Sequence, residues 1–269
     1  MIIAQILALL VIGWLLAAGL MVFMFLLQRK VGDAGIVDIS WSLGVAGVAA
    51  CYAMLAADEL ARVIVVMGLV FAWASRLSFH VWYRFRHLPP DGRYEKLAEQ
   101  WGNQAQARMF RFYQMQALGI VIFSIPILVA LLNPAPLSWI SYGGLVVGLT
   151  GVIGESIADW QLNRFRQNPG NRGEVCQSGL WRFSRHPNYF FEWLHWWGYV
   201  GLAITWMPWG LLSFIGPLAM WYFLTKVTGI PQTEAQAIRS RGDKYREYQR
   251  STNAFFPWFP HPIKNDQSL

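Results

Sequence analysis

The stretch Gly179–Gly198 reads GLWRFSRHPNYFFEWLHWWG, and it joins a polar, basic loop directly to an aromatic segment. Its first half carries two arginines, a histidine and an asparagine, and its second half carries Glu192 and His195 among aromatic residues. Ionisable side chains at the mouth of an apolar helix are costly to keep there, and they usually mark a place where something polar is bound. The stretch therefore predicts a membrane helix whose entrance is a binding site.

The composition of the whole chain is that of a membrane protein. Of its 269 residues, 55% are apolar and 14% are charged, whereas a soluble domain averages about 25% charged residues. The apolar residues form seven runs that are long enough, or nearly so, to cross a hydrocarbon core, which needs about 20 residues. These predicted spans are residues 2–27, 36–57, 61–83, 115–132, 137–158, 189–206 and 209–227. We expect an all-α, seven-transmembrane-helix bundle that forms a single domain over residues 1–269, followed within that domain by the tail 228–269.

The basic residues predict how the spans are oriented. Arginines and lysines follow the first, third, fifth and seventh spans, whereas the connections 57–60, 133–136 and 207–208 hold none. Since positive residues prefer the cytoplasmic side, the N-terminus is expected outside and the C-terminus in the cytoplasm. The net charge of +7 is then a signature of topology, and nucleic acid is not an expected partner. The two cysteines form neither a disulfide framework nor a zinc spacing, so no metal site is expected.

Two carboxylates lie inside the fifth predicted span. Glu155 and Asp159 are four residues apart and share one helix face. Carboxylates that face lipid are very costly, so both must face protein or water. They form either an ion-paired helix end or the polar wall of a site that opens to the cytoplasm.

The loop after this span is rich in arginine. Guanidinium groups match phosphate oxygens bidentately, so a phosphorylated ligand would explain them, although the positive-inside rule alone would also place arginines here. These residues are Arg166, Arg172, Arg182 and Arg185. Asn188 and Glu192 follow on one face of the sixth span, where an amide and a carboxylate can hold a carboxamide or a ribose hydroxyl. Neither a G-x-G-x-x-G nor a G-K-[ST] motif is present to hold a nucleotide in another way.

Further polar residues lie at the second and third spans and beyond the seventh. Asp38 opens the second span as a helix cap or as a functional acid, and His80 and Tyr83 continue one face of the third span toward the cytoplasm. The tail adds another acidic residue and two tyrosines, which form either an interfacial amphipathic helix or a lid over the cytoplasmic mouth. They are Glu234, Tyr245 and Tyr248.

Several motifs together resemble the bacterial steroid 5-alpha-reductase-like integral membrane proteins. They are D-x-x-W-x-x-G (38–44), A-D-x-Q (158–161), G-L-W-R-x-S-R-H-P-N-Y-F-x-E-W (179–193), G-x-P-x-x-E (229–234) and K-Y-x-x-Y (244–248). The resemblance covers nearly the whole chain, and the S-R-H-P-N-Y-x-x-E-W run is its most specific part. The same superfamily contains the eukaryotic steroid 5-alpha-reductases, the sterol delta-14 reductases and the isoprenylcysteine carboxyl methyltransferases.

The resemblance implies a helix bundle that holds NADPH from the cytoplasmic side. The residues that match the cofactor contacts of the reductases are Glu155, Asp159, Arg166, Asn188 and Glu192. Looser matches from the same regions are Arg172, Arg185, Glu234, Tyr245 and Tyr248. In the reductases a glutamate of the second span and a tyrosine of the third polarise the substrate carbonyl. Here Asp38 replaces the glutamate, and His80 or Tyr83 stands for the tyrosine, which has no clean counterpart.

The expected function is NADPH-dependent reduction of the carbon–carbon double bond of a lipophilic enone, such as a 3-oxo-delta-4 steroid, with hydride transfer to the beta carbon. Two alternatives stay open at this point: an S-adenosylmethionine-dependent membrane methyltransferase of the same superfamily, and a non-enzymatic lipid-binding or transport protein. The expected location is the bacterial inner membrane, where the lipid bilayer is a partner and the cofactor site faces the cytoplasm.

Overall fold

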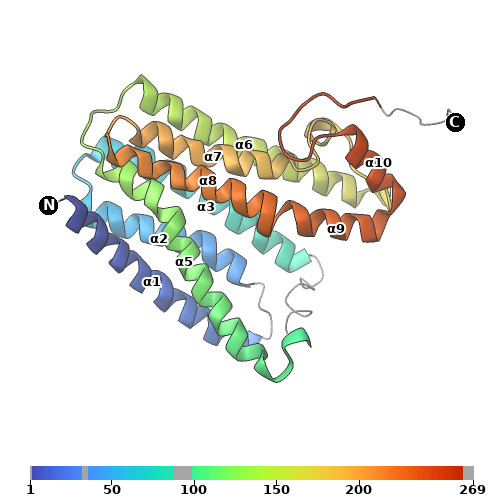
Figure 1. The fold of residues 1–269 in the computed structure, drawn as a ribbon, viewed down its shortest axis with the longest axis horizontal. Helices are drawn as coiled ribbons and strands as arrows, with labels where there is room; N and C mark the ends of the chain where they lie inside the picture. Colours follow the sequence, from blue (N-terminus) through green and yellow to red (C-terminus); the bar gives the residue numbers. More distant parts are fainter. Residues whose placement is uncertain (1, 32–35, 88–98, 263–269) are drawn as a thin grey trace. The chain divides into compact units, whose positions relative to one another are not determined.

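The structure, a computed structural model, describes residues 2–31, 36–87 and 99–262. These residues form helices and no strand, which confirms the all-α prediction for this part of the chain. The helices are α1 (Ile2–Val31), α2 (Ile36–Ala56), α3 (Leu60–His87), α5 (Ala105–Leu132), α6 (Trp139–Gln167), α7 (Pro187–Ala203), α8 (Ile215–Tyr222), α9 (Ile230–Arg241) and α10 (Asp243–Ser251) (Figure 1). Short 3₁₀ segments lie at η1 (Gly102–Gln104), η2 (Pro169–Asn171), η3 (Gly179–Arg182) and η4 (Trp209–Phe214), and η5 (Phe223–Val227) is a π-helical turn.

Six stretches of the described residues are long and apolar enough to cross a bilayer, and each overlaps one of the seven predicted spans. They are Ile2–Lys30, Ile39–Ala56, Leu60–Tyr83, Glu99–Leu132, Trp139–Gln167 and Trp209–Arg241. The other predicted span, residues 189–206, falls on α7, a shorter helix of 17 residues that ends at Ala203. The chain is thus a helical membrane protein with six candidate spanning helices in its described part, while the seventh span and the orientation stay predictions.

The chain divides into two compact units. Unit 1 comprises Met1–Leu145 and Tyr199–Gly216, and unit 2 comprises Val146–Gly198 and Pro217–Leu269. The boundaries between the units fall inside α6, α7 and α8. The single domain over residues 1–269 that the sequence suggests stays a prediction.

The core of unit 1 lies where α5 packs against α1 and α2 (Figure 1). Trp41 of α2 meets Trp73 of α3 and Phe123 of α5 edge-on, with ring centroids 5.8 Å and 5.3 Å apart, a geometry that aromatic rings favour. Gly44 leaves room for α5, because a Cβ atom there would lie 2.5 Å from Ile120 Cδ1. The tryptophan and the glycine of the D-x-x-W-x-x-G motif therefore have packing roles in this unit.

Arg62, in the first turn of α3, is buried in unit 1 with only 1% of its surface exposed. Its Nη1 donates to the carbonyl oxygens of Leu202 at 3.1 Å and of Ala130 at 3.4 Å, and its Nη2 donates to the carbonyl oxygen of Ala135. Leu202 and Ala130 lie in the last turns of α7 and α5, where carbonyl groups have run out of intrahelical donors. Arg62 thus satisfies the ends of two helices and the turn that follows α5.

In unit 2, α6 and α7 approach closely because α6 carries glycines on the side that faces α7. A Cβ atom on Gly151 would lie 2.6 Å from the backbone nitrogen of His195, and one on Gly154 would lie 2.3 Å from the ring of Phe191. Small residues let helix backbones come close together, as is usual among membrane helices. This close approach brings the polar residues of the two helices within reach of one another.

We expect Gly151→Ala to destabilise the protein, because the added methyl group would meet backbone atoms of α7 that cannot move aside. Overpacking of this kind costs about 1–3 kcal/mol, which thermal unfolding in detergent would measure as a lower midpoint. Gly143→Ala on the same helix is the matched control, since nothing lies within 4 Å of a Cβ atom there. An equal loss of stability in both variants would contradict the packing argument.

Arg62→Met is expected to lower the free energy of unfolding by about 3 kcal/mol, because buried carbonyl groups left without donors cost about 1–3 kcal/mol each. Arg62→Lys should lose less, since the ammonium group can still donate. The control is Arg164→Met on α6, whose side chain is exposed and lies over the ring of Trp160. Thermal unfolding of the three variants in one detergent tests this, and a neutral Arg62→Met would refute it.

Candidate functional site

Three carboxylates are buried on α6 and α7 in unit 2. Glu155, Asp159 and Glu192 are 6%, 8% and 6% exposed. Asn188 Nδ2 donates to Asp159 Oδ1 at 3.2 Å and so connects α7 to α6, while Glu192 Oε1 accepts from Trp196 Nε1 at 3.2 Å. The structure thus brings Asp159 and Asn188 together, with Glu155 one turn away on α6 and Glu192 one turn away on α7.

Asn188 retains an unused acceptor. Since an ionised carboxylate only accepts hydrogen bonds, the amide nitrogen of Asn188 must be the atom that faces Asp159. The other amide atom, Oδ1, is buried and accepts no hydrogen bond from any residue that the structure describes. A buried acceptor without a donor costs about 1–3 kcal/mol. The atom can therefore accept from a donor outside the chain, such as a water molecule, a carboxamide or a hydroxyl group.

The loop that leads from α6 back to α7 is anchored on α6. Leu180 N donates to Gln161 Oε1 at 2.8 Å, and Trp181 Nε1 donates to the carbonyl oxygen of Ala158 at 2.9 Å. Gly179 has a φ of +61°, and a Cβ atom there would lie 2.5 Å from the Gln161 side chain, so glycine is required. Gln161 was not among the predicted site residues, although its place in the A-D-x-Q motif was a signal that could have identified it.

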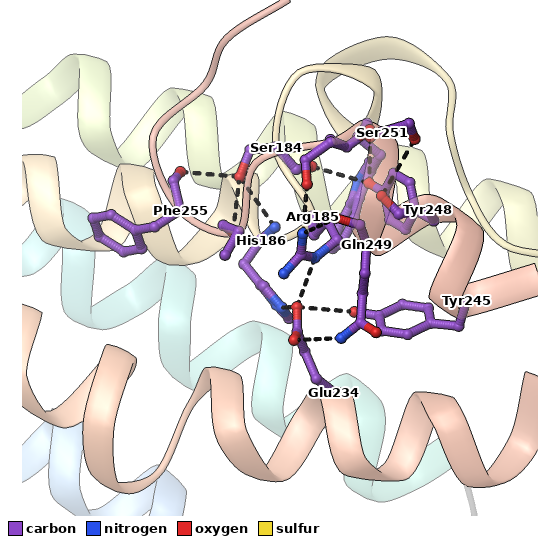
Figure 2. A network of polar contacts seen from close by, with 12 residues as sticks. Ser184, Arg185, His186, Glu234, Tyr245, Tyr248, Gln249, Ser251 and Phe255 are labelled. Atoms are coloured by element: carbon purple, nitrogen blue, oxygen red, sulfur yellow. Dashed lines mark hydrogen bonds and ion pairs between the residues drawn. The ribbon is translucent and has the colours of Figure 1, made fainter. Parts of the chain in front are cut away.

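Arg185 joins the end of this loop to α9 and α10 (Figure 2). Its Nε donates to Glu234 Oε1 at 2.7 Å. Its Nη1 donates to the carbonyl oxygens of Gln249 at 3.0 Å and of Thr252 at 2.5 Å. The arginine therefore binds both the carboxylate of α9 and the C-terminal end of α10.

Glu234 collects three further donors. His186 Nε2 lies 3.3 Å from Oε1, Tyr245 donates its hydroxyl to Oε1 at 3.5 Å, and Gln249 Nε2 donates to Oε2 at 2.7 Å. Figure 2 shows these side chains converging on the carboxylate. We refer to Arg185, His186, Glu234, Tyr245 and Gln249 as the Glu234 cluster. His186 and Gln249 were not predicted as site residues, and no local pattern in the sequence pairs either with Glu234.

The two tyrosines of the tail are buried donors. Tyr248 donates its hydroxyl to the carbonyl oxygens of Trp181 and of Ser184, the latter at 3.1 Å. Its ring packs edge-to-face on Tyr245, with centroids 5.9 Å apart. Burial raises the pKa of both hydroxyl groups, so both stay protonated and keep donating.

His186 is held neutral in this environment. Burial lowers the pKa of its imidazole, and the hydrogen bond to Glu234 opposes this only in part. The ring stacks on Tyr189, with centroids 5.3 Å apart. Because the carboxylate of Glu234 only accepts hydrogen bonds, we assign the proton of the neutral His186 ring to Nε2, the nitrogen that faces it.

The predicted phosphate-binding arginines other than Arg185 lie on the surface of unit 2. Arg166 is in the last turn of α6, Arg172 follows the 3₁₀ turn η2, and Arg182 ends η3, and all three are exposed. On a protein surface, guanidinium groups can bind a phosphate bidentately. Their cofactor role stays a prediction.

The predicted substrate-side residues belong to unit 1. Asp38 lies near the start of α2, and its side chain is outside the part of the chain that the structure describes. His80 and Tyr83 lie toward the end of α3, where His80 is half-buried and Tyr83 is 36% exposed. Their proposed action on a carbonyl group stays a prediction.

Comparison with known proteins gave one family. The sequence model of the family described as "Protein of unknown function (DUF1295)" matches residues 24–252, from within α1 to the end of α10. The match includes the Asp159–Asn188 pair and the Glu234 cluster. No curated protein and no solved structure matched the chain.

We expect acid to destabilise the protein through His186. Because burial lowers the pKa of this residue, the folded state keeps the ring neutral, whereas the unfolded chain takes up a proton as the pH falls through about 6.5. The contribution of the neutral His186 ring to the free energy of unfolding is complete above that pH and is lost progressively below it. The thermal midpoint should therefore fall between about pH 7.5 and 5.5.

His186→Gln is the matched variant, because glutamine keeps an N–H donor near the position of Nε2 but does not titrate. Over the same pH range, its midpoint should fall less than that of the wild type. The facing carboxylate of Glu234 does not mimic this effect, since hydrogen bonds from His186, Arg185 and Gln249 lower its pKa to about 2, well below this pH range. Equally steep curves for the two proteins would contradict the assignment.

Proposed function

The chain belongs to the DUF1295 family, and from that premise and the buried polar groups of unit 2 we propose that it is an NADPH-dependent membrane reductase. We take this family to be the steroid 5-alpha-reductase-like one that the sequence motifs resemble. The proposed reaction reduces the carbon–carbon double bond of a lipophilic enone, of which a 3-oxo-delta-4 steroid is an example. Hydride is added at the beta carbon and a proton at the alpha carbon.

The observation that carries the proposal is the buried acceptor of Asn188 beside the carboxylate of Asp159. A nicotinamide carboxamide offers an N–H donor to Asn188 Oδ1, and a ribose hydroxyl offers a donor to a carboxylate such as Glu192. The residues present therefore fit the polar groups of a nicotinamide nucleotide. Glu155 lies one turn from Asp159 on α6 and is the second buried carboxylate of that helix.

The charges around the site favour a phosphorylated ligand. Arg166 and Arg172 are exposed on unit 2 and would hold the 2′-phosphate bidentately. S-adenosylmethionine has a sulfonium and no phosphate, so it offers a group of arginines only its single carboxylate. The negative charge of the phosphates of NADPH therefore distinguishes it from S-adenosylmethionine as a ligand for these arginines.

In the proposed enzyme, bound NADPH supplies the hydride. The protein binds and orients the nucleotide through Asp159, Asn188 and Glu192. Following the resemblance to the reductases, we propose Asp38, His80 and Tyr83 as the candidates for an acid that donates a hydrogen bond to the substrate carbonyl and stabilises the negative charge that develops on its oxygen. Apolar helices admit a lipophilic substrate from the bilayer.

We further propose that the protein crosses the bacterial inner membrane seven times, with α7 as the additional span and the N-terminus outside. The arginines that follow the predicted spans support this orientation. The Asp159–Asn188 pair then lies at the cytoplasmic side, where NADPH is available.

Asp159→Ala and Arg166→Ala should each weaken NADPH binding by about tenfold or more, because hydrogen bonds to charged groups contribute about 1.5–3 kcal/mol. Arg164→Ala is the matched control, since it removes an exposed arginine of the same helix turn that is not assigned to the site. Titration of the purified, detergent-extracted protein, followed by nucleotide fluorescence, gives the three affinities.

Parallel titration with S-adenosylmethionine separates the reductase from the methyltransferase alternative. Binding of NADPH alone supports the proposal, and binding of S-adenosylmethionine alone refutes it. Unchanged NADPH affinity in both Asp159→Ala and Arg166→Ala would also refute the assigned site.

A further inference from the structure

We infer that Arg185 and Glu234 are positioning residues that hold Asn188 in place and do not themselves contact the nucleotide. The inference rests on the proposed function, in which Asn188 meets the cofactor. The resemblance to the reductases gives Arg185 and Glu234 as cofactor contacts. We assign them another role because their polar groups already bind other residues of unit 2.

The carboxylate of Glu234 has little capacity left for a ligand. An ionised carboxylate offers about four lone-pair sites. Arg185, His186 and Tyr245 face Oε1, and Gln249 donates to Oε2. The side chain is also only 14% exposed. A ribose hydroxyl that approached Oε1 would have to displace one of its three donors, and Oε2 already accepts from Gln249.

The guanidinium of Arg185 is similarly engaged, with 11% of the side chain exposed. Gln249 lies in the last turn of α10 and Thr252 directly after it, so the carbonyl groups that accept from Nη1 are at the negative end of the helix dipole. A cation is favourable there. Arg185 thereby fastens the loop before α7 to α10, and its bond to Glu234 fastens the same loop to α9.

Backbone contacts complete this attachment (Figure 2). Arg185 N donates to the carbonyl oxygen of Asn253 at 2.9 Å. The hydroxyl of Ser184 donates to the carbonyl oxygen of Phe255 at 2.9 Å and accepts from His186 N at 3.1 Å. The loop is therefore fixed up to the residue before Pro187, with which α7 begins.

Asn188 is the second residue of α7, so the path of the loop sets the direction of its side chain. Its bond to Asp159 is 3.2 Å long, at the upper end of the usual range for N–H···O bonds, so a small displacement breaks it. Misplacing a positioning group by about 1 Å can lower a rate by about 100-fold. Disrupting the Glu234 cluster should therefore impair the nucleotide contact of Asn188 from a distance.

A comparison of NADPH with NADH tests this role, because the two nucleotides differ only in the 2′-phosphate. Glu234→Gln removes the negative charge of the cluster and nearly keeps its shape. If the pair positions Asn188, the affinities for NADPH and NADH both fall by the same factor, about tenfold or more. Arg166→Ala is the contrasting variant, which should weaken NADPH and leave NADH nearly unchanged.

A second variant exchanges the partners. Glu234→Gln combined with Gln249→Glu moves the carboxylate to the neighbouring side chain, since Gln249 Nε2 lies 2.7 Å from Glu234 Oε2. Arg185 already binds the backbone of Gln249, with Nη1 3.0 Å from its carbonyl oxygen. This double variant should recover part of the affinity for both nucleotides. Hydrogen–deuterium exchange of the nucleotide-free protein should show faster exchange over residues 183–190 in Glu234→Gln and slower exchange again in the double variant.

The outcomes separate the inference from the proposed function. A loss confined to NADPH in Glu234→Gln, or unchanged affinity for both nucleotides, overturns the positioning role and leaves the reductase proposal standing. A wild-type protein that binds neither nucleotide overturns the reductase proposal and this inference with it. If Glu234→Gln does not fold, Arg185→Lys, which keeps the charge but loses the Nε donor, is tested by the same criterion.

Discussion

The carboxylate of Glu234 gathers hydrogen-bond donors from two other segments of unit 2. Arg185 and His186 come from the loop before α7, and Tyr245 and Gln249 come from α10. A largely buried carboxylate is costly unless its oxygens are satisfied, so a shift of any of these segments would break a hydrogen bond to Glu234. The loop, α9 and α10 therefore form one connected piece, and the position of the first turn of α7 follows from it.

Spacing along the sequence predicted which polar residues share a helix face in unit 2, but it did not predict their partners. Four-residue intervals place Asp159 on the same face as Glu155, and Glu192 on the same face as Asn188, and the structure buries all three carboxylates. Contacts between distant segments are not visible in such intervals, since Arg185 and Glu234 are 49 residues apart. A guanidinium suits a carboxylate as well as a phosphate. The residue types that predict a phosphate site thus form an internal ion pair here.

The apolar runs predicted the long helices because a bilayer requires the backbone to satisfy its own hydrogen bonds, which a helix does. The less regular parts were not predictable in this way. Residues 209–227 have the hydropathy of one span, yet the structure divides them into a 3₁₀ segment, α8 and a π-helical turn. Gly229 lies close to the backbone there, where a Cβ atom would be 2.5 Å from the carbonyl oxygen of Leu224. Hydropathy does not encode close backbone contacts of this kind.

Unused hydrogen-bonding capacity indicates a ligand more sharply than residue type does. Arg185 and Tyr248 are buried or nearly so and have the chemistry of functional residues, yet each donates to carbonyl groups or a carboxylate of the protein. Asn188 differs, because its Nδ2 binds Asp159 while its buried Oδ1 receives no donor from the described residues. In the proposed enzyme, the satisfied Glu234 cluster fixes the geometry and the incomplete Asp159–Asn188 pair binds the nucleotide. This division follows from the rule that a buried polar group must be satisfied, because a group that the protein leaves incomplete is completed by an ordered water or by a ligand.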